Sequence, residues 1–107
     1  MSTYIILTKL APDAFRDPAE FPGIAKMVAD KIKADCPNVT WKESYVVTGQ
    51  YDIIDIVESP DLVTVQRAEG IIRAYGHGRT ETLVATAWGD FLETIGGKKG
   101  TATIGVV

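Results

Sequence analysis

Apolar residues recur along the chain with two spacings, one of about two residues and one of about 3.6, and segments of the two kinds alternate. Four segments have strand-like patterns, at residues 3–9, 39–48, 51–58 and 79–86. The first and third are so dense in Ile and Val that we expect both faces of these strands to be buried.

The second strand segment alternates, with an exception on each face. One face would carry Val39, Trp41, Tyr45 and Val47, with Glu43 as the exception. The other face would carry Thr40, Lys42, Ser44 and Thr48, with Val46 as the exception. This pattern predicts a strand with one wetter face, and the Gly49-Gln50 pair that follows predicts a short hairpin connection.

Helical spacing appears in two longer segments. The first has an apolar stripe at Phe21, Ile24, Ala25, Val28 and Ile32. Its start is indicated by Asp17 as a cap, Pro18 at the first position and Glu20 completing a capping box. Its end is expected by Cys36, because Pro37 cannot continue a helix.

The second helical segment has an apolar stripe at Val65, Ala68, Ile72 and Tyr75. We expect Ser59 to cap this helix, Pro60 to take its first position, and Gly76 and Gly78 to end it. Residues 90–95 are expected to form a short final helix closed by Gly96-Gly97.

The resulting order is strand-helix-strand-strand-helix-strand, which predicts an α+β domain over residues 1–97. Right-handed crossovers place both helices on one face of a four-stranded antiparallel sheet, the ferredoxin-like arrangement. The opposite face of the sheet would still carry apolar side chains. Because such a patch predicts a partner surface, we expect a homodimer formed sheet to sheet, or a multiple of such dimers.

Residues 98–107 are expected to be a tail outside this domain. Residues 101–107 (TATIGVV) alternate, which would suit a fifth strand added at a sheet edge, even on a partner chain. The alternative is a frayed terminus.

Composition and charge narrow the classes of partner. The chain has 107 residues, of which 46% are apolar and 23% charged, the mixture of one globular domain. The net charge of −3 and the scattered Lys and Arg residues argue against nucleic acid as a partner. No apolar run is long enough to span a bilayer, no leader pattern is visible, and the single cysteine excludes an intrachain disulfide. A cytoplasmic protein is the expectation.

Four short stretches resemble the GYD domain family in order and spacing. They are residues 3–10 (TYIILTKL), 49–52 (GQYD), 57–61 (VESPD) and 78–83 (GRTETL). The Gly-x-Tyr-Asp run names the family, and Gln50 fills its variable position here. The resemblance covers roughly residues 3–95.

This resemblance implies a ferredoxin-like subunit related to the dimeric α/β-barrel proteins. It implies no particular activity, because that superfamily includes cofactor-free monooxygenases, isomerases, haem-degrading enzymes and ligand-sensing regulatory domains. The chain departs from the family pattern in its tail beyond Gly97 and at Asp55, where a small apolar residue is expected.

Asp55 and His77 are the candidate catalytic residues. A carboxylate desolvated among aliphatic neighbours holds a proton more readily, which suits a general base. The alternatives for Asp55 are a pair across strands or exposure through the dimer opening. His77, the only histidine, lies between Gly76 and Gly78 and could act as an acid or a base near neutral pH, although a loop histidine can also be merely solvated.

Six further residues are candidates for ligand binding. His77 and Arg79 together could hold an anionic group, with Arg79 offering a bidentate fork. Trp41 and Tyr45, expected on one strand face, could line an apolar pocket that Glu81 approaches, or could simply pack in a core. The Tyr51 phenol could donate a hydrogen bond to a ligand oxygen, whereas in a structural reading Tyr51 packs and Asp52 holds turn amides.

No metal site is indicated, because one His and one Cys far apart form no ligand cluster. The cofactor, if any, is unknown. Cys36 is expected to be an inert packing residue.

These observations leave three functions open. The first is a small-molecule-binding or regulatory domain with a pocket between sheet and helices. The second is a cofactor-free enzyme acting on an aromatic or oxo-acid substrate through His77 and Asp55. The third is an assembly protein that oligomerises through its tail.

Overall fold

The computed structural model describes residues 1–76 and 78–97. The elements, in chain order, are β1 (Ser2–Leu10), η1 (Pro18–Glu20), α1 (Phe21–Asp35), β2 (Thr40–Val46), β3 (Ile53–Ser59), α2 (Leu62–Gly76), β4 (Gly78–Ala85) and α3 (Trp88–Gly96). The order of strands and helices is the one that the sequence predicts. His77 and the tail at 98–107, including its proposed edge strand, lie outside the described residues.

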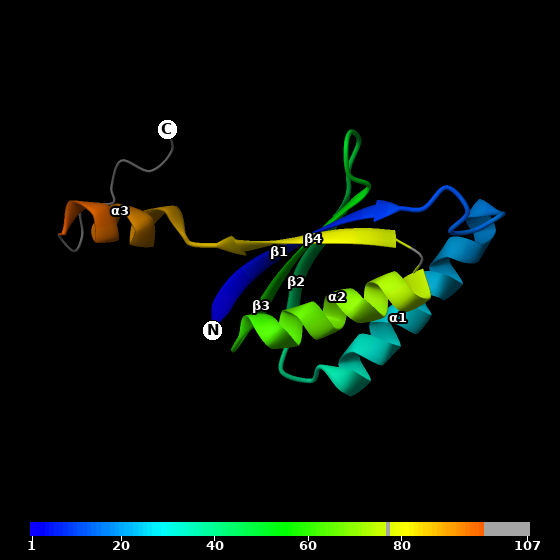
Figure 1. The fold of residues 1–107 in the computed structure, drawn as a ribbon, viewed down its shortest axis with the longest axis horizontal. Coiled ribbons are helices and arrows are strands. Elements are labelled where there is room, and N and C mark those ends of the chain that lie inside the picture. The colour runs from blue at the N-terminus through cyan, green and yellow to red at the C-terminus, as the bar shows by residue number, and fades with distance from the viewer. Residues whose placement is uncertain (77, 98–107) are drawn as a thin grey trace.

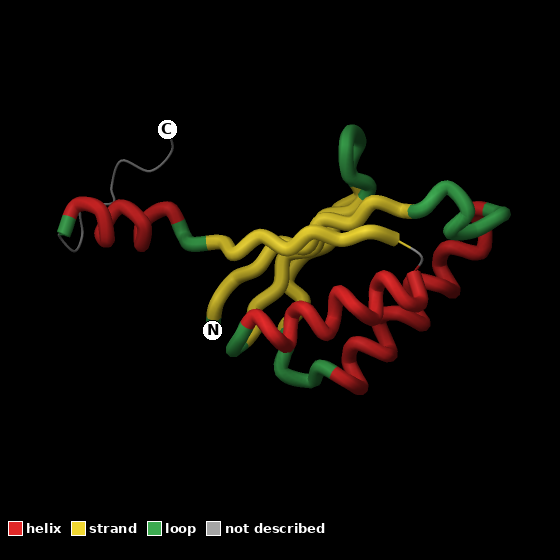
Figure 2. Tube along the Cα trace, viewed as in Figure 1, coloured by secondary structure: helices red, strands yellow, loops and turns green. Residues whose placement is uncertain are grey.

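The four strands form one antiparallel sheet in the order β2-β3-β1-β4. The first strand of the chain is therefore an inner strand, paired on one side with β3 and on the other with β4. Helices α1 and α2 lie together on one side of the sheet, as Figures 1 and 2 show. This confirms the ferredoxin-like α+β prediction.

The core lies mainly between α2 and the two inner strands. In β1, Tyr4, Ile6 and Thr8 are buried toward the helices, and Val57 of β3 lies beside them. From the helices, the core receives Val65, Ala68 and Ile72 of α2 and Ile32 and Cys36 at the end of α1. Tyr75 of the predicted α2 stripe is instead exposed, with the Lys31 ammonium over its ring.

The inner strands are not fully buried on both faces in the single chain. On the side away from the helices, Ile5 and Leu7 of β1 and Ile54 and Ile56 of β3 are only half-buried. We call this side the open face of the sheet. Its apolar character is the one that the sequence predicts.

The two long helices begin differently. The predicted capping box is present at the 3-10 helix η1, which leads directly into α1: the Asp17 carboxylate accepts from the Ala19 amide, and the Glu20 carboxylate accepts from the Asp17 amide. At the start of α1 itself, Glu20 forms no side-chain cap. For α2 the predicted Ser59 cap is wrong, and Pro60, predicted at the first helical position, lies before the helix. The helix begins at Leu62, and the Asp61 carboxylate accepts from both the amide and the hydroxyl of Thr64. These bonds hold the pKa of Asp61 below its ordinary value of 3.8.

A β-bulge in β2 changes which residues share a face. Trp41 pairs with Val57 but Glu43 already pairs with Ile56, so Lys42 is the extra residue. After the bulge, Ser44 and Val46 share the helix side with Trp41, and Glu43 and Tyr45 face the other way. The prediction that Trp41 and Tyr45 share a face is therefore wrong.

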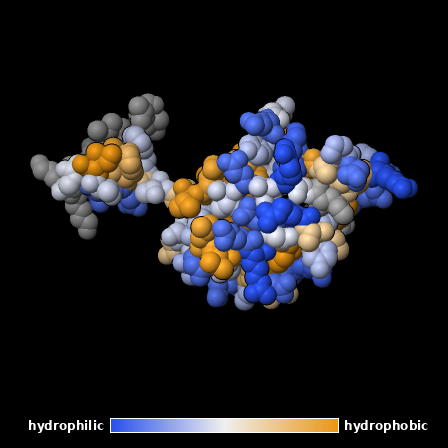
Figure 3. Space-filling view, viewed as in Figure 1, coloured by the Kyte–Doolittle hydropathy of each residue, from blue (hydrophilic) through white to orange (hydrophobic). Residues whose placement is uncertain are grey.

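Helix α3 extends away from the rest of the fold at the end of β4 (Figure 1). No Cα atom of α3 lies within 8 Å of a Cα atom of another described helix or strand. Its Trp88, Phe91 and Ile95 side chains are exposed, and apolar surface gathers there in Figure 3. Among the helices of residues 1–76 and 78–97, none has the length and apolar character needed to cross a membrane.

Candidate functional site

A cavity of about 660 Å³ lies between α1 and the helix side of the sheet. The cavity forms because α1 packs against α2 and lies farther from the strands than α2 does. No Cα atom of α1 lies within 8 Å of a strand Cα in the described chain. The predicted stripe of α1 lines this space, and of that stripe only Ile32 is fully buried. The stripe thus forms one wall of a cavity between sheet and helices, where the first functional hypothesis expects a pocket.

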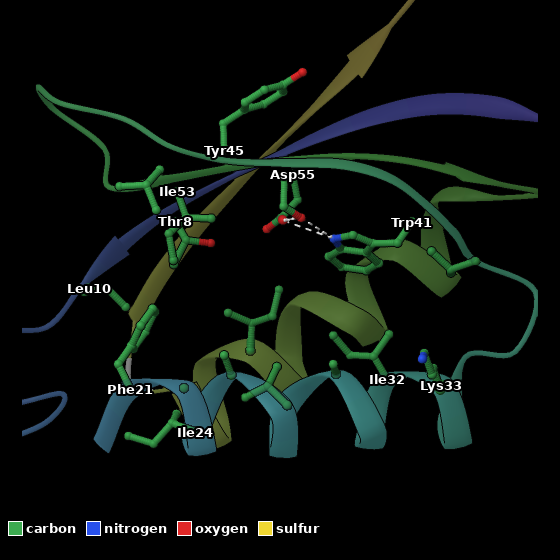
Figure 4. Close-up of a pocket in the computed structure, with 18 residues that line it drawn as sticks. Thr8, Leu10, Phe21, Ile24, Ile32, Lys33, Trp41, Tyr45, Ile53 and Asp55 are labelled. Carbon is green, nitrogen blue, oxygen red and sulfur yellow. Dashed lines mark hydrogen bonds between the residues drawn. The ribbon is translucent and has the colours of Figure 1, made fainter. Parts of the chain in front are cut away.

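The cavity has an apolar floor and roof. Phe21 and Ile32 of α1 face Leu10, Ile53 and Trp41 on the strand side (Figure 4). Ile24 and Val28 of α1 also line the cavity. A volume of this size and an apolar lining with a few polar groups are typical of sites for small organic molecules.

Asp55 is the acidic group in this cavity wall. Its side chain points from β3 toward the helices and is 7% exposed. Oδ1 accepts a hydrogen bond of 3.0 Å from the Trp41 indole nitrogen and one of 2.6 Å from the Ser44 hydroxyl. The indole nitrogen also lies 3.1 Å from the Ser44 hydroxyl oxygen, so the three side chains form one cluster.

Two more polar side chains line the cavity. The Thr8 hydroxyl is buried and has no hydrogen-bond partner among the described residues. Lys33 lies on α1 below Trp41 and forms no ion pair with Asp55. The sequence reading missed Thr8, Ser44 and Lys33. The two exceptions to alternation, Glu43 and Val46, are the signal that reveals the bulge and turns Ser44 inward.

Tyr45 points away from the cavity, toward the open face (Figure 4). Its side chain is 52% exposed, and only its strand position borders the cavity wall. Of the predicted aromatic pair, Trp41 alone therefore contributes its ring to the cavity.

Tyr51, Arg79 and Glu81 gather elsewhere, on the open face. With Lys9 and Gln50 they line a shallow, mostly polar hollow of about 310 Å³. The Tyr51 phenol donates a hydrogen bond to Oε1 of Glu81, and this bond raises the pKa of Tyr51 above its ordinary value of 10.0. The prediction that Glu81 approaches the Trp41 group is wrong, because Glu81 pairs with Leu7 on the opposite face.

Asp52 forms hydrogen bonds to backbone groups of two other segments. Its Oδ2 accepts from the Leu10 amide at 2.8 Å, its own amide donates to the Thr8 carbonyl, and its carbonyl accepts from the Val47 amide. These bonds tie the β2–β3 connection to the end of β1, so they match the structural alternative for this residue.

Of the two candidate catalytic residues, Asp55 lies in the cavity wall and His77 lies outside the described residues. Asp55 is on the helix side, whereas Tyr45, Tyr51 and Arg79 are on the other side of the sheet or at its rim. Within the described ranges, no three His, Cys, Asp or Glu side chains gather closely enough to hold a metal ion.

Comparison with known proteins gives a family and a fold. The model of the GYD domain matches residues 4–95. A protein of Thermus thermophilus named glutamine synthetase and cystathionine beta-lyase binding protein is 32% identical over 92 residues, which are 86% of this chain and 96% of that protein.

Two solved structures resemble the fold. The crystal structure of FFRP-DM1 is 32% identical with a TM-score of 0.50, over 80% of this chain and 100% of that one. The leucine response regulatory protein LrpA of Mycobacterium tuberculosis has a TM-score of 0.57 at 13% identity, over 80% of this chain. The chain spans about half of LrpA, 51% of its length, and at this identity the likeness concerns the fold alone.

Proposed function

The chain belongs to the GYD domain family, and from that premise we propose that it is a small-molecule-binding domain whose ligand occupies the cavity under α1. One observation carries the proposal. An apolar space of about 660 Å³ is bordered by the hydrogen-bonded cluster of Asp55, Trp41 and Ser44. Apolar pockets with a few convergent polar groups are where small ligands bind.

The test uses a probe and a matched pair of variants. We expect 2-phenylethanol to bind with amide chemical-shift changes concentrated on α1, β2 and β3. Ala29→Phe should abolish these changes, because Ala29 lines the cavity and a phenyl ring there fills it. Ala34→Phe is the control, since Ala34 is exposed on the same helix and does not line the cavity. Binding that survives Ala29→Phe unchanged would refute this site.

Native mass spectrometry of the protein as purified gives an independent test. A small molecule carried through purification should be present in the unmodified protein and absent from Ala29→Phe. The same extra mass in both proteins would place that molecule outside the cavity.

We further propose that the domain, residues 1–97, is a cytoplasmic homodimer closed through the open face, as in the dimeric α/β barrels. Ile5, Leu7, Ile54 and Ile56 are half-buried in the single chain, and Leu83 beside them is exposed. Covering such a patch with its symmetry copy is favourable, and a two-fold interface closes on itself.

Sedimentation measurements test the dimer. We expect the unmodified protein to be dimeric and Leu7→Lys to be monomeric, because the substitution places charge in the centre of the open face. Val63→Lys is the control, since Val63 is already exposed on α2. A monomeric unmodified protein would refute the dimer.

A second candidate function is protein binding. It is favoured by the name of the Thermus thermophilus relative and by the exposed apolar side of α3. Under this proposal Phe91→Asp combined with Ile95→Asp should abolish capture of purified glutamine synthetase, whereas Thr94→Asp, also exposed on α3, should not. Equal capture by all three proteins would exclude α3 as the binding element.

The cofactor-free enzyme finds less support. Asp55 and Trp41 lie on the helix side of the sheet, whereas Tyr45 and Tyr51, invoked with them, do not. The tail-assembly alternative concerns residues 98–107 and stays a separate proposal, tested by deleting them and measuring the oligomeric state.

A further inference from the structure

Asp55 is a buried carboxylate whose charge is not balanced by a described cation. The ion pairs of the described chain join Lys26 to Asp30, Lys42 to Glu58 and Arg73 to Glu69. None includes Asp55. Burying a charge is costly unless it is paired, so the observed arrangement favours a ligand that supplies the missing positive charge.

The hydrogen bonds of Asp55 leave one oxygen available. Both donors, the Trp41 indole and the Ser44 hydroxyl, bond to Oδ1. Oδ2 receives no hydrogen bond from the residues described. An ionised carboxylate has lone pairs for about four donors, so Oδ2 can accept from a ligand.

Thr8 supplies a second unused polar group beside the cavity. Its side chain is 2% exposed, and its hydroxyl has no partner in the described chain. In the β1–β3 ladder Thr8 pairs with Ile53 and Ile6 pairs with Asp55, so Thr8 and Asp55 are diagonal neighbours on the helix side. A donor group between them would satisfy both.

We infer that the ligand of the cavity is an organic ammonium ion with an apolar body. This inference rests on the proposed function, because it names the ligand class of the same site. The ammonium group donates to Asp55 Oδ2 and to the Thr8 hydroxyl oxygen. A protonated amine has up to three donors and no acceptor, which matches two acceptors and one negative charge.

The rest of the cavity fixes how the ligand lies. Figure 4 places Lys33 below Trp41, at one end of the cavity, and Phe21 and Leu10 at the other, with Thr8 toward the latter. The Lys33 end carries a charged ammonium group, whereas the Phe21 and Leu10 end is apolar. The apolar body therefore extends from Asp55 along the α1 stripe toward Phe21 and Leu10.

Three probes of nearly equal shape test the charge preference. They are 2-phenylethylamine, which is protonated at neutral pH, the neutral 2-phenylethanol, and the anionic 3-phenylpropanoate. Titrations followed by amide chemical shifts should show the amine binding at least about tenfold more tightly than the alcohol, because charge-assisted hydrogen bonds are about twice as strong as neutral ones. The anion should bind most weakly.

Two variants connect this preference to the named groups. In Asp55→Asn the amine and the alcohol should bind about equally, because the negative charge is gone. Thr8→Val removes the unpaired hydroxyl at nearly constant shape, so it should weaken amine binding about threefold while leaving the folded protein as stable or more stable. Thr8→Val also keeps the test decisive if Asp55→Asn does not fold.

The outcomes separate the inference from the proposed function. If 2-phenylethanol binds in the cavity as tightly as the amine, or if Asp55→Asn keeps the preference, the ammonium inference is wrong and the binding domain stands. If no probe binds, and if Ala29→Phe carries the same co-purified mass as the unmodified protein, both the ammonium inference and the proposed binding function are refuted. Nuclear Overhauser contacts from the amine's ring to Lys33 and not to Phe21 would overturn the orientation.

Discussion

The indole nitrogen of Trp41 lies 3.0 Å from Oδ1 of Asp55, and this bond joins adjacent strands at positions 14 residues apart in the chain. The bulge at Lys42 lies between the two donors and turns Ser44 to the same side as Trp41, so that the Ser44 hydroxyl reaches the same oxygen. Loss of either donor would leave a buried carboxylate less satisfied.

The first prediction concerns this bond. Trp41→Phe should lower the free energy of unfolding by about 1–3 kcal/mol, because the Asp55 carboxylate loses a donor within the fold. Urea denaturation followed by circular dichroism measures the effect. Trp88→Phe, on the exposed helix α3, should stay within about 0.5 kcal/mol of the unmodified protein. Equal losses in the two variants would argue against a structural role for the indole donor.

The second prediction concerns Asp52. Asp52→Ala should destabilise the fold by about 1 kcal/mol, because the Leu10 amide loses its acceptor. Hydrogen exchange should also accelerate at Leu10 more than at Ile6 in the same strand. Asp13→Ala, the same change at an exposed loop position, should alter neither quantity. Unchanged exchange at Leu10 in Asp52→Ala would contradict the assignment.

The third prediction concerns the Tyr51–Glu81 pair. The bond to Glu81 raises the pKa of Tyr51 above 10.0, so Glu81→Gln should bring this pKa down toward 10.0. Carbon-13 labelling of the tyrosine ring measures the titration, and the Tyr75 resonance serves as an internal reference. Because the folded pKa is raised, the stabilisation from the pair is present below pH 10.0 and is lost as the pH rises through the folded value. If the pKa of Tyr51 is the same in Glu81→Gln and in the unmodified protein, the bond does not persist in solution.

The fourth prediction concerns Cys36, which is 1% exposed. Burial raises the pKa of its thiol above the ordinary 9.0, so the reactive thiolate is scarce in the folded protein at neutral pH. A thiol reagent such as dithionitrobenzoate should react far more slowly with the native protein than with the urea-unfolded one. Ala34→Cys in a Cys36→Ala background moves the thiol to an exposed site nearby and should restore fast reaction. Fast labelling of native Cys36 would mean that the end of α1 opens readily.

Much of the fold follows from periodicity in the sequence. The dense Ile and Val runs predict β1 and β3, and the stripe at Val65, Ala68 and Ile72 predicts the buried side of α2. The capping box at Asp17 and Glu20 depends only on neighbours in the chain, so it too is visible in the sequence.

The candidate site is harder to predict because it depends on long-range geometry. One extra residue at Lys42 turns the Tyr45 side chain to the opposite face. The breaks in alternation at Glu43 and Val46 indicate an irregularity but do not give its position. The stripe of α1 has the spacing of a core-facing helix. Whether such a stripe meets the sheet or borders a cavity depends on where α2 holds the helix. Asp61 replaces Ser59 as the cap because Ser59 is still paired within β3.

The inner position of β1 has a consequence for synthesis of the protein on the ribosome. β1 is made first, yet its two partners, β3 and β4, span residues 53–59 and 78–85. One edge of β1 therefore stays unpaired until β4 has left the exit tunnel, long after both β2 and β3 have emerged. An unpaired strand edge rich in Ile is prone to aggregation. The nascent chain therefore exposes this edge until its last strand emerges, and a chaperone that covers the edge during this interval would protect the chain from aggregation.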